Sequence, residues 1–156
     1  MTWLPETATG ATPIERVFGL RPELFAACRD FATIFWEKRI LDPTLLELCR
    51  LRVGQMLGAE VPALSAAMRD ARAALPPAKV AELAGWWKSD AFSATERACL
   101  RFAEQFVLDP AGIGDGDAAA VVAALGEPGT VAFVEVLAIL DGFSRFTRFL
   151  ELGDEA

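Results

Sequence analysis

The sequence predicts an all-α protein of about seven or eight helices that form one domain over residues 1–156, with a core of about 13–150. Three observations predict this fold. No segment alternates apolar and polar residues between hairpin turns, so strands are not expected. Prolines and capping residues precede apolar residues that recur at helical spacing. With 53% hydrophobic residues in 156, the chain can bury a substantial core without disulfides or metals.

The first helix is predicted to begin at a capping box. Thr12 stands at the N-cap, Pro13 at the first helical position and Glu15 at the third, and Gly19 ends this short helix. A second helix begins at Pro22. Its apolar residues form two adjoining stripes at helical spacing, both expected to be buried: Leu24, Cys28, Phe31 and Phe35, with Phe25, Ala32 and Trp36.

Prolines also set the limits of the next helices. Asp42 and Pro43 begin a third helix, which Gly58 ends. Pro62 opens a fourth, and the Pro76–Pro77 pair stops it because neither ring can continue the hydrogen-bond ladder. A short helix follows, with apolar residues at Val80, Leu83 and Trp87.

The remaining helices lie in the last 65 residues. Ser93 and Glu96 form a second capping box. Asp115 or Asp117 is expected to cap an Ala/Val-rich helix that ends at Gly126. The last and longest helix then begins at Thr130, and its apolar seam is Ile139, Phe143, Phe146 and Leu150.

The charge and the missing residue types exclude several functions. A net charge of -7 gives no positive surface for nucleic acid or anionic lipid, so we expect neither as a partner. The chain has no histidine and no tyrosine. That absence excludes Ser-His-Asp and Cys-His catalysis and His-ligated zinc or haem. We expect no metal and no cofactor.

The cysteines indicate a reducing compartment. Cys28, Cys49 and Cys99 are odd in number and widely spaced, without a Cys-x-x-Cys pair, which favours free thiols over a disulfide framework. The first residues do not resemble a secretory signal. The longest apolar stretch, Val131–Leu140, is shorter than the roughly 20 residues that span a bilayer. We therefore expect a cytoplasmic protein with a buried core helix at this stretch.

Four segments together resemble a known family. The stretch Leu41–Gly58 resembles the signature helix of the carboxymuconolactone decarboxylase and alkylhydroperoxidase-D-like (AhpD-like) superfamily. Pro22–Leu24 resembles the start of its first long helix, Phe92–Ala98 its "FSxxERA" helix start, and Asp141–Phe146 its closing "N-x-x-N-R" helix. The segments occur in the family's order, and the resemblance implies an AhpD-like multi-helix bundle.

The resemblance also implies a reaction whose residues are missing here. In the peroxidase branch, one thiolate of a Cys-x-x-Cys pair attacks the peroxide, the second thiol resolves the oxidised cysteine by forming a disulfide with it, and Glu and His relay protons. The Glu position corresponds to Glu47. The Cys positions correspond to Ala59 and Pro62, and the His position to Ala66. The decarboxylase branch is expected to use a His, which this chain lacks.

Four charged residues remain as candidates for a pocket: Glu47, Glu60, Asp141 and Arg145. Because the family fold brings the signature and closing helices together, a Glu47–Arg145 pair is conceivable. Three interpretations of Glu47 stay open. It forms an exposed i, i+3 ion pair with Arg50, or a buried structural pair with an arginine, or it serves as the acid or base of a ligand-binding or catalytic site.

Two functions compete. The favoured hypothesis is an oligomeric binding or assembly module without thiol peroxidase activity, and the resemblance implies a homo-oligomer, a trimer or hexamer, with a small molecule as a further candidate partner. The alternative is a peroxidase-like or lactone decarboxylase-like enzyme of the same superfamily that uses Glu47, which requires Glu47 in a cleft that solvent reaches. We expect Cys49 to be a small buried side chain with a raised pKa.

Overall fold

A computed structural model gives the fold of the protein, and the structure describes residues 4, 10–59 and 61–152. The described residues form seven α-helices and two short 3-10 helices, with no strand, which confirms the all-α prediction. The elements are α1 (Pro13–Phe18), α2 (Pro22–Glu37), α3 (Pro43–Leu57), α4 (Ala66–Ala74), α5 (Pro77–Glu82), η1 (Leu83–Lys88), α6 (Ala94–Leu108), η2 (Pro110–Gly112) and α7 (Asp115–Phe149).

The predicted helix starts are formed by side-chain caps. Thr12 and Ser93 each close a full capping box, which confirms both predictions. The Asp42 carboxylate accepts hydrogen bonds from the backbone N–H groups of Thr44 and Leu45, 2.7 and 3.0 Å away. These bonds satisfy amide donors that the first turn of a helix leaves without partners.

Two predicted helix starts were wrong. α4 begins at Ala66 rather than Pro62, with Ser65 as its N-cap. The carbonyl of Val61 instead accepts a hydrogen bond from the side chain of Arg50, so its partner is not a backbone N–H of a helix. At α7 the N-cap is Gly114 without a side-chain cap, so neither predicted aspartate fills that role.

Helix α7 contains one break, at the glycine where the sequence predicted a boundary. Gly126 has φ 71° and ψ 169°, outside the helical region, and Pro128 follows two residues later. The Thr130 hydroxyl donates to the Gly126 carbonyl at 2.8 Å. Glycine adopts positive φ without the steric cost of a side chain, which allows the bend. Two helical parts therefore follow one another within Asp115–Phe149, and the second begins directly after Gly126, three residues before the predicted start at Thr130.

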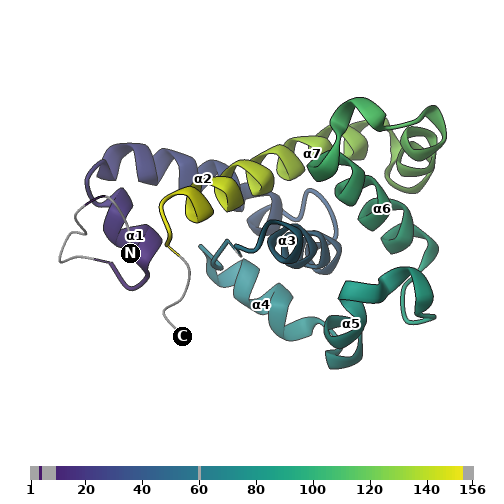
Figure 1. Ribbon diagram of the computed structural model, residues 1–156, viewed down its shortest axis with the longest axis horizontal. Helices are drawn as coiled ribbons and strands as arrows, with labels where there is room; N and C mark the ends of the chain where they lie inside the picture. The colour runs from purple at the N-terminus through teal and green to yellow at the C-terminus, as the bar shows by residue number, and fades with distance from the viewer. Residues whose placement is uncertain (1–3, 5–9, 60, 153–156) are drawn as a thin grey trace.

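Helix α3 lies at the centre of the molecule. Figure 1 shows it nearly end-on, with α7 passing above it, α6 to one side and α4 below, and α3 contacts all three. Apolar side chains from these helices form the main core. A second small cluster joins α1 to the end of α7, and its buried members are Ile14, Val17, Leu150 and Leu152.

Helix α7 contains more apolar residues than the core buries. By length and composition alone, it could cross a membrane, with mean hydropathy 1.6 over its most apolar 18 residues. Only 17% of that window is buried. The expectation of a buried core helix at Val131–Leu140 therefore holds for one face, because Val131 is 68% exposed whereas Phe133 and Leu137 are fully buried.

Candidate functional site

A cavity of about 470 Å³ lies at the C-terminal end of α3, where the family's cysteine positions fall. Ala59 and Pro62 both line it. We call it the Ala59 cavity, and its other lining residues are Thr12, Pro13, Ile14, Gly54, Gln55, Gly58, Thr147 and Leu152. The third corresponding position, Ala66, begins α4 and is not among the lining residues.

Glycines shape the helical wall of the Ala59 cavity. Gly58 ends α3 in the left-handed region, at φ 64° and ψ 28°, as expected for a glycine C-cap. Gly54 lies one turn earlier and leaves the wall without a side chain. Arg148 on α7 ties down this end of α3, because its Nη1 donates to the Leu57 carbonyl at 2.5 Å, beside Gly58. Because Gly54 and Gly58 have no side chains, they leave space for the cavity at the end of α3.

Among the described residues, the lining of the Ala59 cavity contains no titratable side chain. Its polar side chains come from Thr12, Gln55 and Thr147. Both threonine hydroxyls have structural partners. The Thr12 hydroxyl accepts from the Glu15 N–H, and the Thr147 hydroxyl donates to the Phe143 carbonyl at 2.8 Å. Such a lining can hold an uncharged molecule. It supplies neither a nucleophile nor a general acid or base.

Glu47 is fully buried and paired with an arginine on its own helix. Arg50 Nε donates to Glu47 Oε2 at 2.9 Å, and Arg50 Nη2 donates to Glu47 Oε1 at 2.7 Å. The side chains are 0% and 2% exposed. The interpretation of an exposed i, i+3 pair is therefore wrong about exposure, although it identified the partner. Glu47 does not line the Ala59 cavity.

The other predicted pocket residues lie apart from Glu47. Arg145 pairs with Asp141 one turn away, with Nε 2.8 Å from Oδ2, and its Nη2 donates to the Val107 carbonyl. The Asp141 carboxylate, by hydrogen bonding and by its charge, raises the pKa of the Arg145 guanidinium. The conceived Glu47–Arg145 pair was wrong, because Arg50 reaches Glu47 within one helical turn. Glu60 lies outside the described residues.

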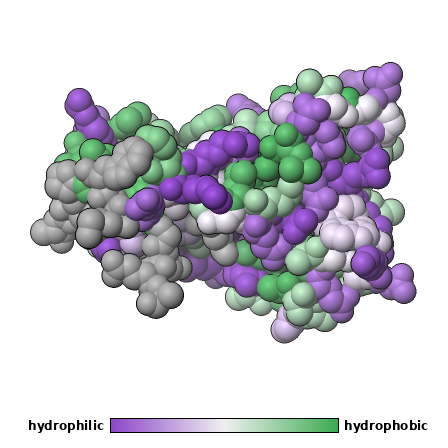
Figure 2. Space-filling model, in the orientation of Figure 1, coloured by the Kyte–Doolittle hydropathy of each residue, from purple (hydrophilic) through white to green (hydrophobic). Residues whose placement is uncertain are grey.

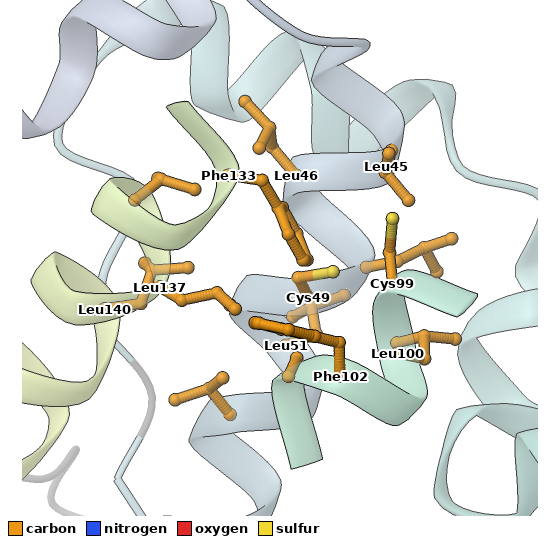
Figure 3. Packing of buried hydrophobic residues seen from close by; sticks show 14 of the residues in the cluster. Leu45, Leu46, Cys49, Leu51, Cys99, Leu100, Phe102, Phe133, Leu137 and Leu140 are labelled. Carbon is orange, nitrogen blue, oxygen red and sulfur yellow. The ribbon is translucent and has the colours of Figure 1, made fainter. Parts of the chain in front are cut away.

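Two of the three thiols are buried in the core. Figure 3 shows Cys49 among the side chains of Phe133, Phe102 and Leu137. Desolvation raises the pKa of Cys49 well above its ordinary value, and it raises the pKa of Cys99 to about 12. Both residues are therefore neutral thiols at physiological pH. Cys28 is half-buried and lines a different surface.

That surface is an apolar groove between α2 and α7, which the sequence analysis did not predict. Its volume is about 360 Å³, and we call it the α2/α7 groove. Leu24 and Phe31 were expected in the core but are 53% and 50% exposed. Helix α2 therefore has more apolar side chains than the neighbouring helices cover. The groove is lined by Phe18, Cys28, Phe31, Ala138, Ile139, Gly142, Phe143 and Phe146.

Comparison with known proteins identifies the family. The model of the carboxymuconolactone decarboxylase family matches residues 22–105, which is more than half of the chain. The chain belongs to the carboxymuconolactone decarboxylase family. The match runs from the start of α2 to near the end of α6, so it includes α3 and the turn that carries Ala59 and Pro62.

A solved structure has the same fold as this family member. It is the crystal structure of a protein of unknown function from Agrobacterium tumefaciens, described as a candidate antioxidant defence protein AhpD. The TM-score is 0.72, with 16% sequence identity, and the match covers 89% of this chain and 95% of the other. At this identity the likeness establishes the AhpD-like fold alone. No curated protein matches the chain significantly.

Proposed function

We propose that this family member has no thiol peroxidase activity and serves as an oligomeric binding or assembly module in the cytoplasm. The observation that carries the proposal is the lining of the Ala59 cavity. Ala59 and Pro62 line it where the family resemblance would place the two reactive cysteines, and none of its described lining residues carries a carboxylate or an amine. The cavity retains room for a small uncharged molecule without groups to transform it.

The remaining thiols do not substitute for the missing pair. Cys49 and Cys99 are fully buried, and their raised pKa values keep them protonated. Peroxide reduction requires a thiolate that the peroxide can reach. Cys28 is half-buried in the α2/α7 groove, and no second cysteine lines that groove to resolve a sulfenic acid as a disulfide. These features support a non-redox function.

The α2/α7 groove supports self-association. Its lining is almost entirely apolar, and Phe31, Leu24 and Val131 stand at least half exposed on the two helices. Figure 2 shows apolar side chains next to hydrophilic ones along α7 on the face in view. A monomer seldom leaves such a surface in water, so we assign its cover to further copies of this chain. A trimer or hexamer is the arrangement that the family resemblance implies.

The alternative function, an enzyme with Glu47 as acid or base, has less support. A general base needs access to substrate, whereas Glu47 is fully buried. Both of its oxygens accept hydrogen bonds from Arg50, which holds the carboxylate in place on its own helix. This arrangement fits the buried structural pair better than a catalytic carboxylate.

Hydroperoxide consumption tests the loss of peroxidase activity. The purified protein is assayed with cumene hydroperoxide and dithiothreitol, beside Cys28→Ser, Cys49→Ser and Glu47→Gln variants. We expect no turnover above the reductant alone in any of them. Turnover that disappears in either cysteine variant would show that a displaced thiol performs the reaction. Turnover that disappears only in Glu47→Gln, with that variant still folded, would favour the alternative enzyme.

Sedimentation velocity tests the assembly. We expect an oligomer at micromolar concentration, and Phe31→Asp should shift it toward monomer because the charge enters the α2/α7 groove. Leu108→Asp is the matched control, since Leu108 is 72% exposed at the end of α6, away from the groove. A wild-type monomer would contradict the proposal. So would flotation of the wild-type protein with phosphatidylcholine vesicles, which would assign the apolar surface to a membrane.

A further inference from the structure

One uncovered stripe of side chains runs along the second part of α7. Its members recur at alternating spacings of four and three residues, which places them on one side of the helix. Val131 and Phe149, at its two ends, are 68% and 61% exposed. We call it the α7 stripe, and its six exposed residues are Val131, Glu135, Ala138, Gly142, Arg145 and Phe149. Ala138 and Gly142 also line the α2/α7 groove, so the stripe continues the surface assigned above to self-association.

The middle of the α7 stripe consists of two small residues, Ala138 and Gly142. An added Cβ at Gly142 would meet no atom within 4 Å among the described residues. The space in front of this part of α7 is therefore open to a second molecule. The distance between packed helices depends on the side chains at the contact, and small ones allow the lower end of the usual range of about 8–10 Å.

The α7 stripe is symmetric about its midpoint at Leu140. Its members form three pairs at equal distances from that residue: Ala138 with Gly142, Glu135 with Arg145, and Val131 with Phe149. Two copies of α7 that lie antiparallel about a two-fold axis at this midpoint bring the members of each pair opposite one another. A small residue then faces a small one, an apolar residue an apolar one, and a carboxylate a guanidinium.

The charges of the α7 stripe have capacity for such a partner. No charged residue stands within four positions of Glu135, and among the described residues it forms no ion pair. Arg145 uses Nε and Nη2 for Asp141 and the Val107 carbonyl, while its Nη1 makes no hydrogen bond within the described part of the chain. Its side chain is 55% exposed. Glu135 and Arg145 each lie roughly 7.5 Å along the helix from the midpoint, so they meet in an antiparallel pair.

We propose that α7 pairs with α7 of a second copy of this chain, antiparallel about a two-fold axis at Leu140. Two ion pairs flank the small residues, each between Glu135 of one copy and Arg145 of the other. The inference rests on the proposed self-association and names its contact. A hexamer of dihedral symmetry contains such two-fold axes, whereas a cyclic trimer does not. The pairing therefore selects the hexamer from the two arrangements that the family resemblance implies.

Sedimentation equilibrium of the full-length protein tests the pairing through the number of copies. We expect an even number for wild type at micromolar concentration. Glu135→Arg should halve it, because two guanidinium groups then face each other at each ion-pair position. An odd number of at least three, or full mass in Glu135→Arg, overturns the pairing and leaves self-association standing. A wild-type monomer overturns both.

Glu82→Arg is the matched control for this charge change. Glu82 is exposed on α5, which Figure 1 shows at the lower side of the molecule, away from α7. It should keep the wild-type mass. If Glu82→Arg also halves the mass, the change in net charge is the cause, and the assigned contact is overturned.

Mixing two variants tests the contact between specific residues. Arg145→Glu alone should also halve the mass, since carboxylates then face one another. An equimolar mixture of Glu135→Arg and Arg145→Glu places a guanidinium opposite a carboxylate at both positions, so it should recover the wild-type mass. Circular dichroism confirms that each variant is folded. A defect within one chain is not relieved by mixing, and a mixture that stays at half mass overturns the pairing.

Gly142→Leu tests the close approach without a change of charge. The added side chain meets no atom of its own chain within 4 Å at Cβ, and leucine favours helix more than glycine, so the fold should persist. The side chain would hold the two helices apart and halve the mass. Gly116→Leu is the matched control, because Gly116 has the same free space but lies in the first turn of α7. Full mass in Gly142→Leu, or half mass in Gly116→Leu, overturns the pairing.

Discussion

Glu47 and Arg50, one turn apart on α3, form a two-point ion pair from which water is excluded. Both carboxylate oxygens accept from the guanidinium, and Arg50 also donates to the carbonyl of Val61, eleven residues away. The pair therefore connects the central helix to the segment that leads into α4. The contacts of the pair give Glu47 a structural role in the fold.

Breaking this pair should destabilise the fold strongly. In Glu47→Gln the Arg50 charge remains buried with a weaker partner, and removing one member of a buried pair costs about 3–5 kcal/mol. Urea unfolding followed by circular dichroism measures the loss. A second change, Arg50→Met, made together with Glu47→Gln, should recover part of it because no uncompensated charge then remains. A cost below about 1 kcal/mol for Glu47→Gln would show that the pair is hydrated in solution.

The matched control is the Asp141–Arg145 pair. Its members are also one helical turn apart, but Arg145 is 55% exposed. Asp141→Asn should cost no more than about 0.5 kcal/mol under the same conditions, because solvent screens an exposed pair. The contrast between the two pairs isolates burial as the cause.

Gly58→Ala should lower stability at the edge of the Ala59 cavity. Gly58 has φ 64°, and an added Cβ would lie 2.7 Å from Arg148 Nη1. Left-handed backbone costs a residue with a side chain about 1–2 kcal/mol. Thermal melting measures the effect. Gly116→Ala, which meets no atom within 4 Å in the first turn of α7, should instead raise the melting temperature, since alanine favours helix.

Alkaline pH should unfold the protein through its buried thiols. Burial, with the Glu96 carboxylate nearby, raises the pKa of Cys99 from 9.0 to about 12. The unfolded chain then ionises this thiol first, so the contribution of Cys99 to stability is constant below about pH 8 and is lost as pH rises from about 9 toward 12. Urea unfolding at a series of pH values measures the slope. Cys99→Ala should make it shallower, and an identical slope would contradict the assignment.

Acid should weaken the start of α6 through Glu96. Partial burial pulls the pKa of this carboxyl upward, but the hydrogen bond from Lys79 and the backbone N–H of Ser93 outweigh it, and the net pKa is lowered from 4.5. The stabilisation is present above pH 4.5 and is lost as pH falls through the folded value. Glu96→Gln should flatten the decline between pH 5 and pH 3 in urea unfolding. Glu37→Gln, at an exposed position, should leave it unchanged.

The helix boundaries were predictable where local chemistry fixes them. Thr12, Asp42 and Ser93 cap helices within three residues of themselves, and Gly58 and Gly126 break helices through their own backbone angles. The prediction of a helix start failed where a hydrogen bond to a residue distant in the sequence determines the local structure. The carbonyl of Val61 bonds to Arg50, so the fourth helix could not be placed from Pro62 alone.

The candidate site was predictable only in part. The positions of Ala59 and Pro62 followed from the resemblance, and both line the cavity. The predicted Glu47–Arg145 pair does not form. Sequence spacing does not show whether Arg50 or Arg145 lies within hydrogen-bond distance of the Glu47 carboxylate.

The sequence by itself determined the helical class, most helix limits, the family and the absence of histidine chemistry, because periodicity, caps and residue types act over a few positions. Only the tertiary structure decided that Glu47 is buried with Arg50, that Cys49 and Cys99 are inaccessible, and that one face of α2 and α7 stays uncovered. Burial depends on which helices pack together, and it sets the charge state and reach of each side chain.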